Sequence, residues 1–220
     1  MKLIDIKDKI PEPAFKVLSE RITDLRPSQE KAINAGLFEK NNLLICTPTA
    51  SGKTFVAELA FLDNIMKDAG KTIYIVPLKA LASEKYKEFS KRYKDIAKIG
   101  ISIGNTDSAE PYLDKYDIIV TTSEKFDSLI RHHTPWLNKV STLILDEIHL
   151  LNDSTRGPTL EIIITLLRQV IKDIHIIGLS ATIGNPKELS SWLDAELVVD
   201  YWRPVELREG VYLNGSINYN

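Results

Sequence analysis

Two short segments of the chain carry residue types that suit the handling of a nucleoside triphosphate. The first is Thr47–Thr54, with the sequence TPTASGKT, and the second is Asp146–His149, with the sequence DEIH. Each follows an apolar run typical of a buried strand, at Leu43–Cys46 and Leu143–Leu145. A Gly-Lys-Thr after a buried strand can bind phosphates, and two carboxylates after another strand can hold Mg²⁺ and position a water. Together the segments predict a site that binds and hydrolyses a nucleoside triphosphate.

The first segment predicts a phosphate-binding loop. The turn that precedes a helix points several backbone N–H groups at one place, where the helix dipole favours an anion. Gly52 lets the backbone approach the phosphates, Lys53 can reach the β- and γ-phosphates, and Thr54 can place its hydroxyl on Mg²⁺. The usual pattern begins with glycine, whereas Thr47 stands at that position here. The remaining residues expected to contact the phosphates are Thr49, Ala50 and Ser51.

The second segment supplies candidate catalytic carboxylates. Asp146 would bind the metal directly or through water, and Glu147 would orient and polarise the attacking water. His149 follows two residues later and can hydrogen-bond a neighbouring segment. Ser180 and Thr182, near the end of another apolar run, could couple these carboxylates to a second surface. The candidate catalytic residues are therefore Lys53, Asp146 and Glu147.

Apolar runs and amphipathic stretches alternate along the chain. The expected strands are Leu43–Cys46, Thr72–Val76, Ile99–Ile103, Ile118–Thr121, Leu143–Leu145, Ile174–Gly178 and Leu197–Val199. The expected helices are Thr54–Lys67, Leu78–Tyr93, Ser123–Arg131, Thr159–Ile171 and Pro186–Leu193. Repeated strand–helix alternation predicts an α/β domain with a mostly parallel sheet and helices on both faces.

Composition narrows the class of protein. The 220 residues, 44% of them hydrophobic, can form one large α/β domain or two small ones. Cys46 is the single cysteine and is expected to be a small core residue, which fits a reducing, cytoplasmic location. No apolar run reaches the roughly 20 residues that span a bilayer, so no membrane is expected as a partner. The net charge of −2 neither demands nor excludes a nucleic-acid partner.

The motifs together resemble those of superfamily-two helicases. Their order and spacing match at Gly52–Thr54, Asp146–His149 and Ser180–Thr182, and further matches lie at Leu25–Gln29, Val76–Leu81 and Thr121–Lys125. The Asp-Glu-x-His form is typical of the DExH branch, and the chain is most similar to its superkiller-type group, which includes archaeal fork-processing DNA helicases. The resemblance implies a RecA-like P-loop domain, ATP and Mg²⁺ as cofactors, and part of a 3′–5′ DNA helicase that acts in DNA repair or at replication forks.

The resemblance also implies roles for single residues. Gln29 would hydrogen-bond the adenine edge, whereas propensity alone would make it a surface residue at a helix start. Arg156 either faces a nucleic-acid channel or merely precedes a helix that starts at Gly157–Pro158. The residues expected to contact the backbone of single-stranded or forked DNA are Pro77, Lys79, Thr121, Thr122, Ser123, Lys125 and Arg156. A mixed-sign run is expected to be only a solvated helix face, namely Lys85, Lys87, Lys91, Arg92 and Lys94 with Glu84, Glu88 and Asp95.

Family helicases close their ATP site between two motor domains, and the second domain supplies arginines. We assign residues 1–200 to the first, ATP-binding motor domain and residues 201–220 to an exit strand or linker toward the second. The arginine-bearing segment of the second domain is absent from this sequence. Such an arginine accelerates phosphoryl transfer by about 10³–10⁵. The chain alone is therefore expected to bind ATP–Mg²⁺ weakly, to hydrolyse it poorly and not to unwind a duplex.

Three alternatives remain open. The same motor could act on RNA, since backbone contacts distinguish the two nucleic acids poorly. A phosphate-loop switch or kinase is a second class, but its guanine-reading Asn-Lys-x-Asp is incomplete at Asn138–Ser141. A non-catalytic nucleotide-binding interaction module is a third, against which the intact Lys53, Asp146 and Glu147 argue.

Overall fold

Seven parallel strands form one sheet in the computed structural model of the chain. The structure describes residues 1–104, 108–206, 210–213 and 215–219. The order across the sheet is β3-β4-β2-β5-β6-β1-β7, and each neighbouring pair runs parallel. The strands are β1 (Leu43–Cys46), β2 (Lys71–Val76), β3 (Ile99–Ser102), β4 (Ile118–Thr122), β5 (Val140–Asp146), β6 (His175–Ser180) and β7 (Glu196–Val199). The predicted α/β class with a parallel sheet is confirmed, and every expected strand is present.

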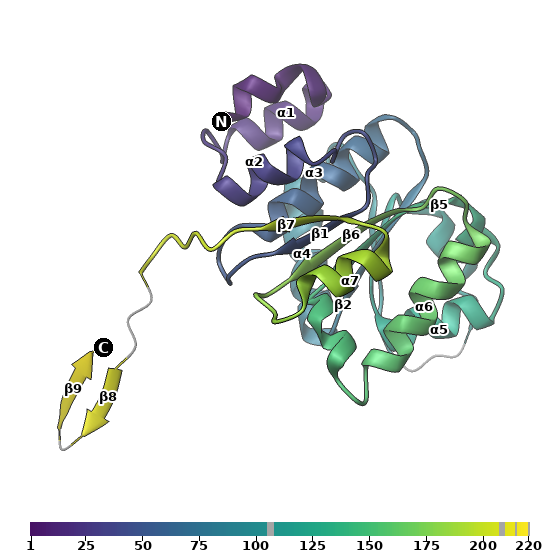
Figure 1. Cartoon of the computed structure of the whole chain (residues 1–220). Coiled ribbons are helices and arrows are strands. Elements are labelled where there is room, and N and C mark those ends of the chain that lie inside the picture. Colours follow the sequence, from purple (N-terminus) through teal and green to yellow (C-terminus); the bar gives the residue numbers. More distant parts are fainter. Residues whose placement is uncertain (105–107, 207–209, 214, 220) are drawn as a thin grey trace.

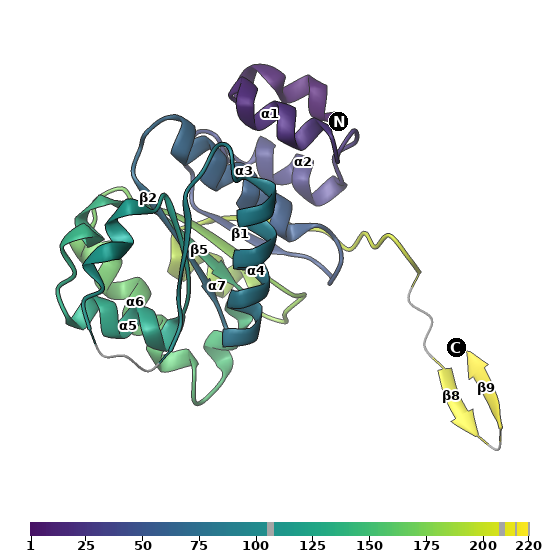
Figure 2. The same ribbon diagram turned by 180° about the vertical axis from the view of Figure 1, so that it is seen from behind.

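Helices cover both faces of the sheet (Figures 1 and 2). The segments on one face are a 3₁₀ helix (Leu3–Lys9), α1 (Glu12–Ser19), α2 (Pro27–Asn34), α3 (Lys53–Met66) and α4 (Lys79–Arg92). Those on the other are α5 (Ser123–Arg131), α6 (Gly157–Val170) and α7 (Pro186–Leu193). Alternate residues of each strand enter the two cores, as Leu43 and Ile45 enter one while Leu44 and Cys46 enter the other. The predicted burial of Cys46 is confirmed.

The ends of the chain differ from the expected pattern. The short helices α1 and α2 were not predicted as elements, because eight residues give too short a periodic pattern to recognise. Residues 201–206 form neither strand nor helix, and position 207 lies outside the described residues, so the assignment of residues 201–220 to an exit strand or linker stays a prediction. Beyond it, β8 (Gly210–Leu213) and β9 (Ser216–Tyr219) pair only with each other in a hairpin (Figure 1). Among the described helices, none combines the length and the apolar character needed to cross a bilayer.

The parallel topology brings all the motif residues to one edge. The carboxyl ends of β4 and β2 meet where Thr122 pairs with Val76, and these strands lead into the candidate nucleic-acid residues. The ends of β5, β6 and β1 follow across the sheet and lead into the acidic motif, Ser180–Thr182 and the phosphate-binding loop. Ligands of open α/β sheets bind outside these carboxyl ends, so the two candidate surfaces are neighbours.

Candidate active site and nucleic-acid edge

The phosphate-binding loop connects β1 to α3 through two left-handed backbone positions. Gly52 has φ +92° and Ala50 has φ +64°. Any side chain at Gly52 would be strained by this φ, and its Cβ would also lie 2.5 Å from Nε2 of Gln29 on α2. The loop is cross-linked internally, because Lys53 Nζ donates to the Thr47 carbonyl at 3.0 Å and the hydroxyls of Thr47 and Ser51 lie 2.7 Å apart. Thr47, the departure from the usual glycine, thus stabilises the loop through its side chain.

Gln29 joins α2 to this loop. Its side chain is buried, so the surface interpretation is wrong. Oε1 accepts the Arg26 backbone N–H at 2.9 Å, which caps α2, and Nε2 donates to the Gly52 carbonyl at 3.1 Å. An amide has two donor hydrogens and two acceptor lone pairs. One of each remains for the adenine edge, the partner that the family resemblance implies for Gln29, and this role stays a prediction.

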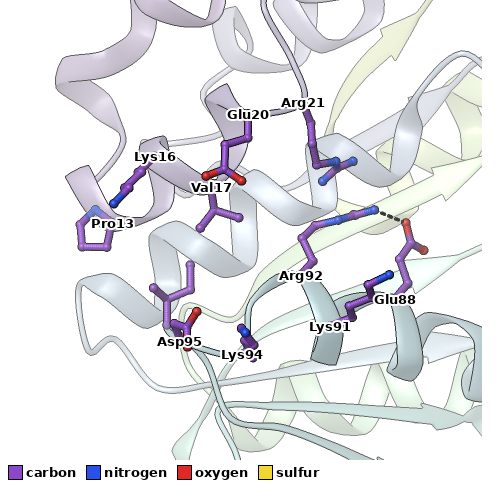
Figure 3. Close-up of a pocket in the computed structure, with 11 residues that line it drawn as sticks. Pro13, Lys16, Val17, Glu20, Arg21, Glu88, Lys91, Arg92, Lys94 and Asp95 are labelled. Atoms are coloured by element: carbon purple, nitrogen blue, oxygen red, sulfur yellow. Dashed lines mark hydrogen bonds and ion pairs between the residues drawn. The ribbon is translucent and has the colours of Figure 1, made fainter.

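A cavity of about 520 Å³ opens beside Gln29 and the loop. Its lining residues include Arg21, Arg26, Gln29, Gly52, Thr54, Phe55, Glu58 and Glu88. A second, larger groove of about 680 Å³ between α1 and α4 shares Arg21 and Glu88 with it (Figure 3). The first cavity is the one that touches the phosphate-binding loop, and we take it as the candidate nucleotide pocket.

A buried carboxylate network supports the wall of this pocket. Glu58 of α3 is 2% exposed and accepts hydrogen bonds from Arg92 at the end of α4 and from the hydroxyl of Tyr93, the next residue. It also accepts one from Arg21 at 3.4 Å. Arg92 also donates to Glu88 at 2.6 Å (Figure 3). Sequence reasoning missed Glu58, whose only signal is a carboxylate within the apolar run Phe55–Leu62.

The expected solvated face of α4 therefore needs a correction. Lys87, Lys91 and Lys94 are exposed as predicted. Lys85 and Arg92 are instead only 15% and 16% exposed, because they turn toward Thr54 and toward Glu58. Charge balance along the sequence gave no sign of which lysines point inward.

The acidic motif is positioned by the end of β5. Asp146 accepts a hydrogen bond at 2.9 Å from the hydroxyl of Tyr74, which lies on the neighbouring strand β2. Burial raises the pKa of Asp146, an effect that the Tyr74 bond opposes. Glu147 adopts a left-handed backbone with φ +54°, and its N–H donates to Asp146 Oδ1 at 3.1 Å. Burial lowers the pKa of Lys53, whereas the negative charges of Glu147 and Asp146 act in the opposite direction.

The residues at the loop and β5 fit Mg²⁺ with a triphosphate. Thr54 and Asp146 offer a hydroxyl and a carboxylate, the hard oxygen donors that this ion prefers. A cation already occupies this neighbourhood, since Lys85 Nζ lies 3.3 Å from Thr54 Oγ1. No three potential metal-ligating side chains cluster anywhere in the described part of the chain. Mg²⁺ sites that use few protein ligands are completed by water and phosphate oxygens.

His149, the last residue of the acidic motif, lies close to both Glu147 and Ala181, the residue that follows β6. Its Nδ1 is 3.3 Å from Glu147 Oε2 and 3.4 Å from the backbone nitrogen of Ala181. One ring nitrogen can donate to the carboxylate when protonated or accept from the N–H when not, but it cannot do both. Ser180 is buried, and its carbonyl accepts from the Thr47 N–H at 3.2 Å, whereas Thr182 is exposed. These contacts join His149 to the residue after β6 and the phosphate-binding loop to Ser180. The coupling role of His149, Ser180 and Thr182 stays a prediction.

The candidate nucleic-acid residues separate into exposed and buried groups. Pro77 is half-buried and Lys79 exposed at the start of α4. The hydroxyl residues Thr121, Thr122 and Ser123 are buried. Lys125 is also buried, with Nζ 2.9 Å from a carboxylate oxygen of Glu110. These buried side chains could contact a nucleic-acid strand only if the residues that cover them moved. Their role in nucleic-acid binding stays a prediction.

Arg156 is half-buried and directly precedes α6, which starts at Gly157. Its backbone N–H donates to Asp153 at 3.0 Å. A Cβ on Gly157 would lie 2.1 Å from the Leu151 carbonyl, so glycine is needed for this close approach. The helix-start interpretation of Gly157–Pro158 is confirmed, and a nucleic-acid role for Arg156 remains a prediction.

The family model described as DEAD/DEAH box helicase matches residues 26–189. The chain belongs to the DEAD/DEAH box helicase family. The match spans α2, the phosphate-binding loop, the acidic motif and Ser180–Thr182, the same segments that the sequence singled out.

Archaeal helicases are similar to this family member over nearly its whole length. It is 52% identical to the ATP-dependent DNA helicase Hel308 of Methanococcus vannielii over 205 residues, which are 90% of the chain and 27% of that protein. It is 48% identical to Hel308 of Pyrococcus abyssi over 215 residues, 97% of the chain and 29% of that protein. The resemblance to archaeal DNA helicases that the sequence motifs predicted is confirmed. The chain spans less than a third of the length of either relative.

Solved helicase structures share the fold. MrfA, a DUF1998 helicase bound to DNA, superposes with a TM-score of 0.74 at 28% identity, over 88% of this chain and 30% of MrfA. The Mycobacterium smegmatis helicase Lhr, bound to single-stranded DNA and AMP-PNP, gives a TM-score of 0.74 at 26% identity, over 87% of this chain and 27% of Lhr. The RecA-like architecture predicted from the sequence is confirmed.

Proposed function

We propose that the chain is the first, ATP-binding motor domain of an ATP-dependent DNA helicase. The observation that carries this proposal is the meeting of Lys53, Thr54, Asp146 and Glu147 at one edge of the sheet, beside a cavity that Gln29 lines. The similarity to helicases named for ATP and DNA supports the choice of nucleotide and of nucleic acid.

The chain's own residues would divide the work. Gln29 offers its free donor and acceptor to adenine, and the N–H groups of the loop receive the phosphates with Lys53, once Lys53 leaves the Thr47 carbonyl. Thr54 and Asp146 hold Mg²⁺, which when bound offsets phosphate charge. Glu147 accepts the proton of the attacking water.

Coupling to nucleic acid would follow the sheet edge. His149 can exchange its partner between Glu147 and Ala181 at the end of β6, so a change at the catalytic carboxylate reaches Ser180 and Thr182. Pro77 and Lys79 lie at the start of α4, next to the same edge, and would contact the strand backbone.

Efficient turnover would need a second motor domain as a partner. We propose that residues 1–200 form the motor domain, that the following segment leads toward that partner, and that the assembled enzyme moves 3′ to 5′ on forks during repair or replication. The isolated chain would bind ATP–Mg²⁺ weakly and turn it over poorly. The cytoplasmic location expected from the sequence belongs to the same proposal.

The decisive experiment compares ATP hydrolysis by this chain and by a version extended through a second motor domain. Each is measured with no nucleic acid, with single-stranded DNA and with single-stranded RNA, beside a Glu147→Gln control. Hydrolysis that appears in the extension, rises with DNA and is lost in Glu147→Gln supports the proposal. Stimulation by RNA alone favours the RNA motor. Fast turnover by the short chain, indifferent to nucleic acid, contradicts the helicase role.

A further inference from the structure

A lysine outside the known motifs reaches the metal side of the site. Lys85 lies in the middle of α4, and its Nζ is 3.3 Å from Thr54 Oγ1, the hydroxyl expected to bind Mg²⁺. Its side chain is only 15% exposed, and its ammonium lies 5.9 Å from the centre of the Phe89 ring. The packed aliphatic part of the Lys85 side chain thus directs its ammonium toward Thr54.

A second partner for Lys85 is already in place. Glu88 lies one turn further along α4, with Oε2 3.4 Å from Lys85 Nζ. Arg92 holds the other carboxylate oxygen of Glu88 at 2.6 Å, so this carboxylate is fixed in position. A small change of the Lys85 side chain would exchange the hydroxyl of Thr54 for full pairing with Glu88.

We propose that Lys85 is a positioning residue that holds the Thr54 hydroxyl before nucleotide binds and would pair fully with Glu88 once Mg²⁺ takes that hydroxyl. This inference rests on the proposed ATP–Mg²⁺ site. The ammonium carries the same sign as the metal, so its position at Thr54 disfavours Mg²⁺ on the same hydroxyl. Lys85 competes with the metal, and Glu88 relieves that competition.

Mg²⁺ dependence of nucleotide binding tests the competition without measuring turnover. A fluorescent, non-hydrolysable ATP analogue is held at fixed concentration with this chain, and Mg²⁺ is titrated to give a half-saturating concentration. Lys85→Met removes the competing charge and should lower that concentration about fivefold, the scale of a screened ion contact. Glu88→Gln removes the receiving charge and should raise it by about the same factor. Lys87→Met, an exposed lysine on the same helix, is the matched control and should leave it unchanged.

The outcomes separate this inference from the proposed function. Opposite shifts in Lys85→Met and Glu88→Gln support it. It is overturned if both variants match Lys87→Met, and also if Lys85→Met weakens binding at every Mg²⁺ concentration, since Lys85 would then bind phosphate. If wild-type protein shows no Mg²⁺-dependent binding, the ATP site itself is refuted. Circular dichroism checks folding, and if Lys85→Met does not fold, Lys85→Arg should keep the wild-type value while Glu88→Gln still raises it.

Discussion

Acid should destabilise this domain through one buried histidine. His175, at the start of β6, is 2% exposed, and its Nε2 lies 2.9 Å from the Asn41 carbonyl, to which it donates in the neutral ring. Its Nδ1 is buried without a hydrogen-bond partner among the described residues. Burial, reinforced by the charge of Lys40, lowers the pKa of His175 to about 4. A proton on Nδ1 would have neither solvent nor an acceptor.

The direction and size of the effect follow from proton linkage. The unfolded chain binds the proton near pH 6.5, whereas the native state resists it down to about pH 4. The contribution of neutral His175 to stability is therefore complete above pH 6.5 and is lost as the pH falls toward 4. The loss is about 2 kcal/mol at pH 5 and reaches roughly 3 kcal/mol at lower pH.

Urea unfolding at pH 7.5 and pH 5 measures this loss. His175→Gln keeps an N–H near the Asn41 carbonyl but cannot titrate, so its free energy of unfolding should fall by about 2 kcal/mol less than that of the wild type. His133→Asn, at an exposed position with φ +47° that asparagine tolerates, should retain the wild-type difference. Equal losses in wild type and His175→Gln would refute the reasoning.

Three further substitutions test the contacts that shape the site. Gly157→Ala places a methyl group against a loop carbonyl at 2.1 Å and should lower the free energy of unfolding by about 2 kcal/mol or more, whereas Gly184→Ala, which enters open space, should change it by less than about 0.5 kcal/mol. Arg92→Met removes the closest cation from buried Glu58 and should cost about 3 kcal/mol in urea unfolding; an unchanged midpoint would show that the remaining partners suffice. Gly52→Ala should weaken binding of the fluorescent ATP analogue at least about fivefold, since a left-handed backbone at alanine costs roughly 1–3 kcal/mol, and equal affinity would contradict this view of the loop.

The sequence predicted what local patterns determine. Runs such as Leu43–Cys46 identify strands because a sheet buried on both faces requires apolar residues at successive positions. The phosphate-binding loop and the acidic motif followed from residue type and their position after such strands. Strand ends were less accurate, since β5 begins at Val140 rather than at the predicted Leu143.

Contacts between distant segments were out of reach. Gln29 is buried because Gly52 lies against it, and nothing near Gln29 in the sequence indicates this. Tyr74 reaches Asp146 only because β2 and β5 are neighbours, an order that strand–helix alternation does not specify. The inward turn of Lys85 likewise depends on how α4 packs beside α3. The sequence alone therefore indicated which segments are helices and strands, but not which residues of distant segments contact one another.

The position of β1 in the sheet has a consequence for how the domain assembles. Strands β3, β4, β2 and β5 are neighbours drawn from the middle of the chain, so this half of the sheet can form once residue 146 is available. β1 has no partner among them, because it pairs with β6 and β7, where Leu43 meets Ile177 and Glu196. The pairing of β1 with β6 joins segments that are far apart in the sequence, and contacts of this kind form slowly. Until they form, the edges of β1 stay unpaired. We therefore expect the strand that carries the phosphate-binding loop to dock late, so that nucleotide binding reports completion of the whole sheet.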